Sequence, residues 1–265
     1  MRTFYYAHTG HRIGLDRFRR GAAIIKSLGE IEITMLCSDF RIAQVAREYG
    51  VENSVGVDVV RNIPQIAHHG DRIIFDSDEA NPIMLEDMKS FFSTFIHIKS
   101  DTVAIDENYF VDEEKTIKMT YFFGDDDYEK DLDKNLSLLD GLKPDLQLGF
   151  YYFLDYEDML KEKFENYHEF EEYQEMIKKT DILITTSPQA VLESLAANGR
   201  PIYIKREDYI DDYDNLFVSL NIPIVENYNN KKLTSIVETI DSQNYQKVEH
   251  LSNKTNEIIK EEINL

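Results

Sequence analysis

The sequence has a single cysteine and no apolar run of the length that a membrane span requires. Cys37 alone cannot form an intramolecular disulfide, and one cysteine is too few for a structural zinc site. The longest apolar stretches, such as residues 148–154, fall far below the roughly 20 residues of a spanning helix. The first seven residues are too short and too polar at their ends for a signal-peptide core. We therefore expect a cytoplasmic protein.

Basic residues are also scarce relative to acidic ones. The chain of 265 residues carries 29 Lys+Arg against 50 Asp+Glu, a formal net charge of −21. Nucleic acids and anionic membranes would repel so negative a protein, and this argues against either as the main partner. A hydrophobic content of 42% is ample for packed cores, and the length suggests about two domains at roughly 150 residues each.

The order of predicted elements indicates an α/β protein. Strands are expected at 4–7, 31–37, 72–75, 95–98, 117–123, 146–153, 181–185 and 201–205. Helices are expected at 16–28, 40–49, 82–91 and 128–139, in two stretches between 156 and 179, from Pro188 to about Gly199, and at 242–263. Alternation of this kind predicts parallel sheets with helices on both faces. An acidic, aperiodic segment at 99–115 suggests two Rossmann-like domains, 1–115 and 116–240, and a closing C-terminal helix in 241–265.

A loop at the end of the first predicted strand leads directly into a helix start, in residues 10–20. Such a loop lies at the carboxyl edge of a parallel sheet, where α/β proteins bind ligands. The N–H groups of the helix start favour an anion, and Arg17 and Arg20, one turn apart, would assist. Alternatively, these arginines pair with the protein's own surplus carboxylates. Both interpretations stay open, although the glycine spacing excludes a P-loop and a dinucleotide fingerprint.

A second candidate site follows the predicted strand at 181–185. Ser187 is a good helix N-cap, and Pro188 suits the first helical position. Ser187 with the helix start would hold a phosphate, while Gln189 and Glu193, four residues apart, share a helix face. A carboxylate at that position would accept hydrogen bonds from ribose hydroxyls. The alternative is that Ser187 only caps the helix and Glu193 is only a solvated surface residue.

Four segments gain meaning when they are considered together, residues 13–20, 73–76, 121–127 and 182–193. They hold the Gly14 loop and its helix start, an apolar strand ending in Asp76, a strand followed by Gly124 and Asp127, and a strand followed by Ser187 and Glu193. In this order they resemble the GT-B superfamily of nucleotide-sugar enzymes, and most of all the small UDP-sugar hydrolases of pseudaminic acid biosynthesis, the PseG type. The resemblance implies a GT-B-like fold and a UDP-sugar ligand.

The chain departs from that family in the first segment. There, a loop histidine acts on the water that attacks the anomeric carbon, and the preceding glycine gives the sugar room. Here Arg17 and Asp16 stand at these two positions. Arginine stays protonated near neutral pH and cannot be a general base. Asp16 would have to replace the base, or His11 or His8 would have to reach the same place.

We therefore expect a protein that binds a UDP-sugar or related nucleotide sugar and acts as a glycosyltransferase or UDP-sugar hydrolase in bacterial surface-glycan or nonulosonic acid metabolism. The catalytic candidates are Asp16, Arg17 and His11. The binding candidates are Gly14, Arg20, Asp76, Gly124, Asp127, Ser187, Gln189 and Glu193. We expect no cofactor and no metal, because helix dipoles and arginines can stabilise a UDP leaving group. The alternative hypothesis is a catalytically inactive relative that serves as a binding or scaffold protein.

Overall fold

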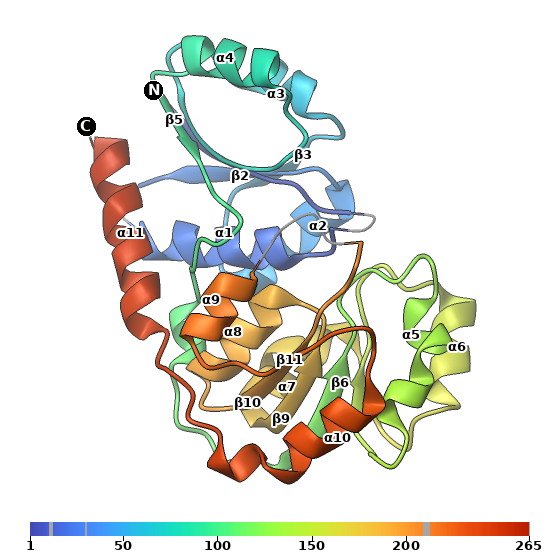
Figure 1. Cartoon of the computed structure of the whole chain (residues 1–265). Coiled ribbons are helices and arrows are strands. Elements are labelled where there is room, and N and C mark those ends of the chain that lie inside the picture. Colours follow the sequence, from blue (N-terminus) through green and yellow to red (C-terminus); the bar gives the residue numbers. More distant parts are fainter. Residues whose placement is uncertain (11–12, 30, 209–212, 265) are drawn as a thin grey trace. The chain divides into compact units, whose positions relative to one another are not determined.

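The chain folds as two compact units in the computed structural model, which describes residues 1–10, 13–29, 31–208 and 213–264. Unit 1 comprises Met1–Gly10, Leu15–Glu107 and His250–Leu265. Unit 2 comprises His11–Gly14 and Asn108–Glu249. In Figure 1 unit 1 is mainly blue to cyan with the red C-terminal helix, and unit 2 runs from green to orange-red.

Unit 1 is built on a five-stranded parallel sheet. Its strands are β1 (Thr3–Ala7), β2 (Ile33–Cys37), β3 (Ser54–Gly56), β4 (Arg72–Asp76) and β5 (Thr94–His97), in the spatial order β3-β2-β1-β4-β5. Its helices are α1 (Asp16–Ser27), α2 (Phe40–Val45), α3 (Ile63–Ile66), α4 (Pro82–Phe91) and α11 (Glu249–Asn264). Helices α3 and α4 lie on one side of the sheet, and α1 and α2 on the other (Figure 1).

The strands of this sheet are apolar on both sides because both faces are covered. All five residues of β1 are buried. Phe4 and Tyr6 of β1 pack with Ile63 and Met88 in one core cluster, on the side of α3 and α4. At the carboxyl end of β2, burial raises the pKa of the Cys37 thiol to about 12. This cysteine is therefore an unreactive part of the core.

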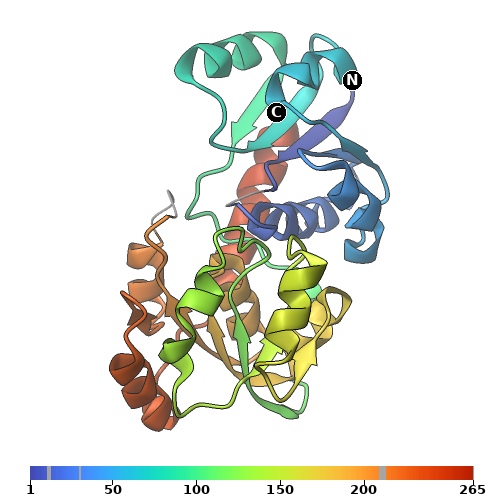
Figure 2. The same cartoon turned by 90° about the vertical axis from the view of Figure 1, so that its right-hand side faces the viewer.

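Unit 2 is built on a six-stranded parallel sheet. Its strands are β6 (Ile117–Phe122), β7 (Asp145–Gln147), β8 (Tyr167–His168), β9 (Thr180–Thr185), β10 (Arg200–Ile204) and β11 (Ile224–Val225), in the order β11-β10-β9-β6-β7-β8. Its helices are α5 (Asp131–Lys134), α6 (Leu154–Lys161), α7 (Tyr173–Lys179), α8 (Pro188–Ala196), α9 (Asp214–Ser219) and α10 (Asn230–Glu238). Figure 2 shows α5 and α6 in front of this sheet.

Alternate residues of these strands serve the two faces of the sheet. Tyr121 and Ile184 belong to a core cluster that also holds Leu132 of α5, Leu160 of α6 and Leu233 of α10. On the other face, the ring of Phe122 lies 5.3 Å from that of Tyr173 in α7. The ring of Tyr203 lies 4.8 Å from that of Phe217 in α9. This two-sided burial is the arrangement that the alternating sequence pattern predicts.

Strand β7 is much shorter than the strand expected at 146–153. A Cβ on Gly149 would lie 2.4 Å from the carbonyl oxygen of Gly124, so the backbone passes too close for any side chain. Two residues later, the Tyr151 N–H donates to the carbonyl oxygen of Asp125 at 2.8 Å. The chain therefore leaves the sheet after Gln147 and binds the turn that follows β6.

Two helices also differ from expectation. The helix expected at 128–139 begins only at Asp131, because Lys130 has a φ of 56°, which no right-handed helix accommodates, and a 3-10 turn at Leu136–Leu139 follows α5. The final helix begins at Glu249, after a 3-10 turn at Ile240–Ser242, whereas the charge pattern predicted a helix from 242. Apolar periodicity locates both segments, but the backbone geometry sets where each helix begins.

Each sheet has one topological switch point. In unit 1 the chain moves outward from β1 to β3 and then returns to β4 on the other side of β1. In unit 2 it moves outward from β6 to β8 and returns to β9 on the other side of β6. In sheets of this kind the crevice beyond the carboxyl ends of the two central strands is the usual ligand site.

Candidate functional site

Four of the candidate residues gather at the switch point of unit 1. Asp76 is the last residue of β4 and pairs in register with Ala7 at the end of β1. Asp16 opens α1, and Arg17 and Arg20 follow one turn apart. Gly14, which belongs to unit 2, has a φ of +68°, a left-handed conformation that favours glycine. The remaining catalytic candidate, His11, lies outside the described residues.

Arg20 and Asp76 form a buried bidentate ion pair. The Arg20 Nη2 atom lies 2.7 Å from Asp76 Oδ1, and its Nε atom lies 2.9 Å from Oδ2. The Tyr5 hydroxyl donates to the same Oδ2 at 2.8 Å, and Arg20 Nη1 donates to the carbonyl oxygen of Ser100 at 2.7 Å. Burial, with the charge of Asp76, raises the pKa of Tyr5 well above its usual value, so its hydroxyl remains a donor. Of the two interpretations of Arg17 and Arg20, the contacts of Arg20 match the one in which the arginines pair with the protein's own carboxylates.

Arg17 makes a second pair on the same edge. Its Nη1 atom lies 2.7 Å from Asp78 Oδ1, and its Nε atom lies 3.9 Å from Asp76 Oδ1. His8 Nδ1 lies 3.2 Å from the same Asp78 oxygen. These hydrogen bonds, from His8 first and then Arg17, hold the pKa of Asp78 well below its usual value. Arg17 therefore sits between carboxylates, as a permanent cation that cannot accept a proton.

Asp16 is the one described catalytic candidate that can accept a proton. Its side chain is 15% exposed, and Arg19 Nη1 lies 3.8 Å from its Oδ1. A carboxylate at the start of a helix is stabilised by the helix dipole. Chemically, Asp16 is suited to accept a proton from water or from an acceptor hydroxyl.

The candidates of the other two segments gather at the switch point of unit 2. Gly124 and Asp127 follow β6, and Gly124 has a φ of +120°, which only glycine adopts readily. Ser187 follows β9, where Thr186 Oγ1 donates to the carbonyl oxygen of Phe123 and thus ties the two turns together. Gln189 and Glu193 lie on α8, which starts at this edge.

Asp127 is held by neutral donors. Its Oδ1 accepts the N–H of Asp131 at 2.7 Å, and its Oδ2 accepts the N–H of Leu132 at 3.1 Å and the hydroxyl of Tyr156. Burial raises the pKa of Asp127 above its usual value, although these hydrogen bonds act in the opposite direction. Asp127 thus organises the start of α5 and anchors α6 at this edge.

Helix α8 carries a side-chain network at its start. Ser187 Oγ accepts the N–H of Ala190 at 3.1 Å, which confirms the predicted cap. Gln189 Nε2 donates to Glu193 Oε1 at 3.0 Å, so these two residues share a helix face as their spacing predicts. The hydroxyl of Tyr173 in α7 donates to Glu193 Oε2 at 2.6 Å. Glu193 is only 1% exposed, so it is not a solvated surface residue.

Sequence reasoning missed a buried arginine on this edge of unit 2. Arg206 lies two residues beyond the end of β10, and its guanidinium carbon is 4.7 Å from the ring centroid of Phe123. Its Nη1 atom donates to the carbonyl oxygen of Asp126 at 3.2 Å. The signal available in the sequence was the Lys205-Arg206 pair immediately after an apolar strand. Basic residues at that position lie at the same carboxyl edge as Ser187.

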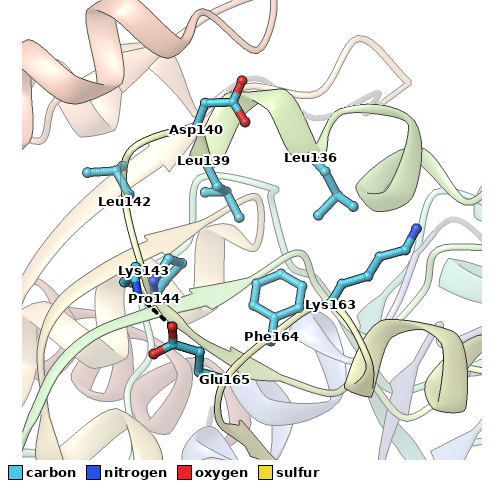
Figure 3. Close-up of a pocket in the computed structure, with 9 residues that line it drawn as sticks. All are labelled: Leu136, Leu139, Asp140, Leu142, Lys143, Pro144, Lys163, Phe164 and Glu165. Atoms are coloured by element: carbon cyan, nitrogen blue, oxygen red, sulfur yellow. Dashed lines mark hydrogen bonds and ion pairs between the residues drawn. The ribbon is translucent and has the colours of Figure 1, made fainter.

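A hollow of about 280 Å³ lies at the opposite edge of the unit 2 sheet (Figure 3). Pro144 and Glu165, on its lining, precede β7 and β8 and therefore mark the amino ends of these strands. Its other lining residues include Leu139, Leu142 and Phe164, and an ion pair of 2.5 Å joins Lys143 to Glu165 across its rim. None of the candidate site residues lines this hollow.

The described residues contain no group of three or more His, Cys, Asp and Glu side chains arranged to hold a metal ion. Within the same ranges, no helix combines the length and the apolar character that crossing a membrane requires.

Comparison with known proteins identifies the fold. No protein-family model matches the chain, and no curated protein matches it in sequence. Among solved structures it is similar to the UDP-GlcNAc 2-epimerase of Methanocaldococcus jannaschii in complex with UDP-GlcNAc and UDP, with a TM-score of 0.62, 10% identity and all of both chains covered. It is also similar to Alr3699/HepE of Anabaena in complex with UDP-glucose, with a TM-score of 0.58, 10% identity and coverage of 98% of this chain and 100% of that one.

A third similar structure is the spinosyn rhamnosyltransferase SpnG with spinosyn aglycone, at a TM-score of 0.56 and 8% identity, covering 100% of this chain and 96% of that one. Identities this low establish the fold and no more. With two parallel-sheet Rossmann-like units, this chain has the GT-B-like α/β fold that the four sequence segments predicted.

Proposed function

We propose that the protein binds a nucleotide sugar, most specifically a UDP-sugar, and catalyses group transfer at its anomeric carbon, as a glycosyltransferase or a UDP-sugar hydrolase. Unit 2 would hold the nucleotide through the start of α8 and the Gly124 turn. Unit 1 would contribute Asp16 as the general base.

The topology is the observation that carries this proposal. Residues chosen from four separated segments of the sequence lie beside the switch points of the two sheets, β1/β4 in unit 1 and β6/β9 in unit 2. Ligands of doubly wound sheets bind at such points. A helix start such as that of α8, with its N–H groups and dipole, is suited to phosphate.

Proteins of the same fold supply the ligand class. The Methanocaldococcus jannaschii epimerase was solved with UDP-GlcNAc and UDP, and the Anabaena protein with UDP-glucose. These ligands belong to those proteins, and the proposal extends their chemical class to this chain.

The pairing of Arg17 favours the inactive alternative as a second candidate. If the resemblance to the PseG type holds, Arg17 takes the place of the catalytic histidine, and it is paired with Asp78 at 2.7 Å. An arginine cannot serve as the base. A protein that binds nucleotide sugars without turning them over would retain the unit 2 edge and lack a working base in unit 1.

Calorimetric titration tests the binding part of the proposal. UDP, UDP-GlcNAc and UDP-glucose are titrated into wild type and into Ser187→Ala, with Ser235→Ala, an exposed serine of α10, as the matched control. We expect micromolar to millimolar binding of at least one ligand, weakened in Ser187→Ala and unchanged in Ser235→Ala. No heat and no thermal shift at millimolar ligand would refute the proposal.

A UDP-release assay separates the two candidate functions. The enzyme hypothesis predicts release that disappears in Asp16→Asn and persists in Asp87→Asn, which changes an exposed aspartate of α4. The inactive alternative predicts ligand binding with no UDP release from any variant. Release that increases when a candidate acceptor is added identifies a transferase, and release with water alone identifies a hydrolase.

A further inference from the structure

Arg206 of unit 2 is fixed in place on its inner side. Its guanidinium lies over the ring of Phe123 at 4.7 Å, and Nη1 donates to the carbonyl oxygen of Asp126. Phe123 in turn accepts a hydrogen bond from Thr186, the residue before the cap of α8. The arginine is therefore connected to both turns of the β6/β9 switch point, and its side chain is only 5% exposed.

The other side of the same guanidinium is occupied by a carboxylate. Arg206 Nε donates to Asp208 Oδ1 at 2.8 Å, and Nη2 donates to Oδ2 at 2.6 Å. This is the two-pronged geometry in which arginine binds either a carboxylate or a phosphate. Asp208 is 40% exposed and lies only two residues from Arg206 in the chain. Because Asp208 is solvated and close to Arg206 in the chain, its carboxylate can turn into water when another anion takes the fork.

We propose that Arg206 binds the phosphate groups of the ligand and that Asp208 occupies the guanidinium until a phosphate replaces it. This inference rests on the proposed function and adds the residue that recognises the diphosphate. The charge of the edge supports it. Residues 125–127 are three buried aspartates in the turn after β6, and they would repel a phosphate. A fixed cation beside that turn offsets the repulsion, and Arg206 contacts the turn directly through Asp126.

The test uses two variants with effects of opposite sign. UDP is titrated by calorimetry into wild type, Arg206→Lys and Asp208→Asn. Lysine keeps the charge but loses the fork, so we expect UDP to bind Arg206→Lys about 10-fold to 100-fold more weakly, the range for lost hydrogen bonds to a charged group. Asparagine removes the competing negative charge, so we expect UDP to bind Asp208→Asn several-fold more tightly.

The control is the arginine at the amino end of β10, the strand that Arg206 follows. This residue, Arg200, forms a fork with Asp181 at the opposite edge of the sheet, and Arg200→Lys should leave UDP affinity unchanged. If Arg206→Lys does not fold, the result for Asp208→Asn decides alone. Unchanged or weaker binding by Asp208→Asn, or unchanged binding by a folded Arg206→Lys, overturns the inference and leaves the proposed function intact. Failure of wild type to bind UDP, UDP-GlcNAc and UDP-glucose alike refutes the proposed function itself.

Discussion

The two units stabilise a buried aspartate in different ways. Each places an aspartate at or just beyond the carboxyl end of a central strand, Asp76 after β4 in unit 1 and Asp127 after β6 in unit 2. Asp76 is neutralised by the guanidinium of Arg20. Asp127 is surrounded by neutral donors, two backbone N–H groups and the hydroxyl of Tyr156. A cation cancels the buried charge, whereas neutral donors only solvate it, and burial accordingly raises the pKa of Asp127.

This difference affects how each unit can meet an anionic ligand. In unit 1 the predicted anion-binding residues, Arg17 and Arg20, bind Asp78 and Asp76, so a phosphate would have to compete with partly or fully buried carboxylates. In unit 2 the corresponding competitor is Asp208, which is local and half exposed. Displacement is easier there than from the buried Arg20–Asp76 pair, and Arg206 is also connected through Phe123 to the turn before α8. For these reasons we assign the phosphate-binding role to Arg206.

The largest expected effect on stability comes from removing the ion pair between Arg20 and Asp76. Arg20→Met should lower the free energy of unfolding by about 3–5 kcal/mol, because it removes the bidentate partner of the buried Asp76 carboxylate and leaves Arg17 Nε 3.9 Å away. Urea denaturation followed by circular dichroism measures this change. The matched control is Arg41→Met, which removes an exposed bidentate pair with Asp39 and should cost about 0–1 kcal/mol. Equal effects of the two variants would show that burial does not decide the strength of these pairs.

Removing a hydrogen bond from Asp127 should cost less stability than removing the ion pair of Asp76. Tyr156→Phe removes one donor from Asp127 and leaves the two backbone N–H groups in place. We expect a loss of about 1–3 kcal/mol, the cost of one unmade hydrogen bond to a buried polar group. Tyr167→Phe, at a tyrosine that is 44% exposed in the same unit, is the control and should be nearly neutral. A loss as large as that of Arg20→Met would contradict the comparison.

Much of this fold follows from local patterns in the sequence. The apolar strands and the Ser187-Pro188 helix start predict β9 and α8, and the cap bond from Ala190 confirms the local chemistry. The end of β7 was not predicted because it depends on a contact between distant segments. No pattern within 146–153 shows that Gly149 meets the backbone of Gly124, and that contact ends β7 early.

The candidate site could likewise be predicted only in part. The sequence identifies residues at strand ends, because turn chemistry and apolar runs are local signals. It does not identify their partners, since Arg20 and Asp76 are 56 residues apart and Tyr173 and Glu193 are 20 apart. The two interpretations of Arg17 and Arg20 therefore stayed open until their contacts could be seen. Arg206 was not predicted because its role depends on contacts with Phe123 and Asp126, which lie far away in the chain.

Helix starts give a smaller test of the comparison. Helix α8 of unit 2 has a side-chain cap from Ser187, whereas Leu15, before α1 of unit 1, provides none. Ser187→Ala should therefore cost about 1 kcal/mol in thermal or urea unfolding, and Ser187→Asp, which can also cap, should recover part of it. The exposed control Ser235→Ala should change stability by less than 0.5 kcal/mol, as is usual at surface sites. No recovery in Ser187→Asp would mean that Ser187 acts through packing.

The smallest expected effect is on the pH dependence of stability, where the two units should differ in sign. The pKa of Asp78 is lowered by His8 and Arg17, so its contribution is present above the unfolded pKa of about 3.9 and is lost as the pH falls below it. The pKa of Asp127 is raised by burial, so its contribution is complete below about pH 3.9 and is lost as the pH rises through the folded pKa.

Free energies of unfolding between pH 3 and pH 7 test this difference in wild type, Asp78→Asn and Asp127→Asn. We expect Asp78→Asn to flatten the loss of stability in acid, by less than a buried pair would, because the Asp78 side chain is 33% exposed. Asp127→Asn should instead steepen the gain in stability as the pH rises from 4. Curves that shift in the same direction in both variants would mean that Asp78 and Asp127 experience the same electrostatic environment, and the contrast between cationic and neutral partners would be wrong.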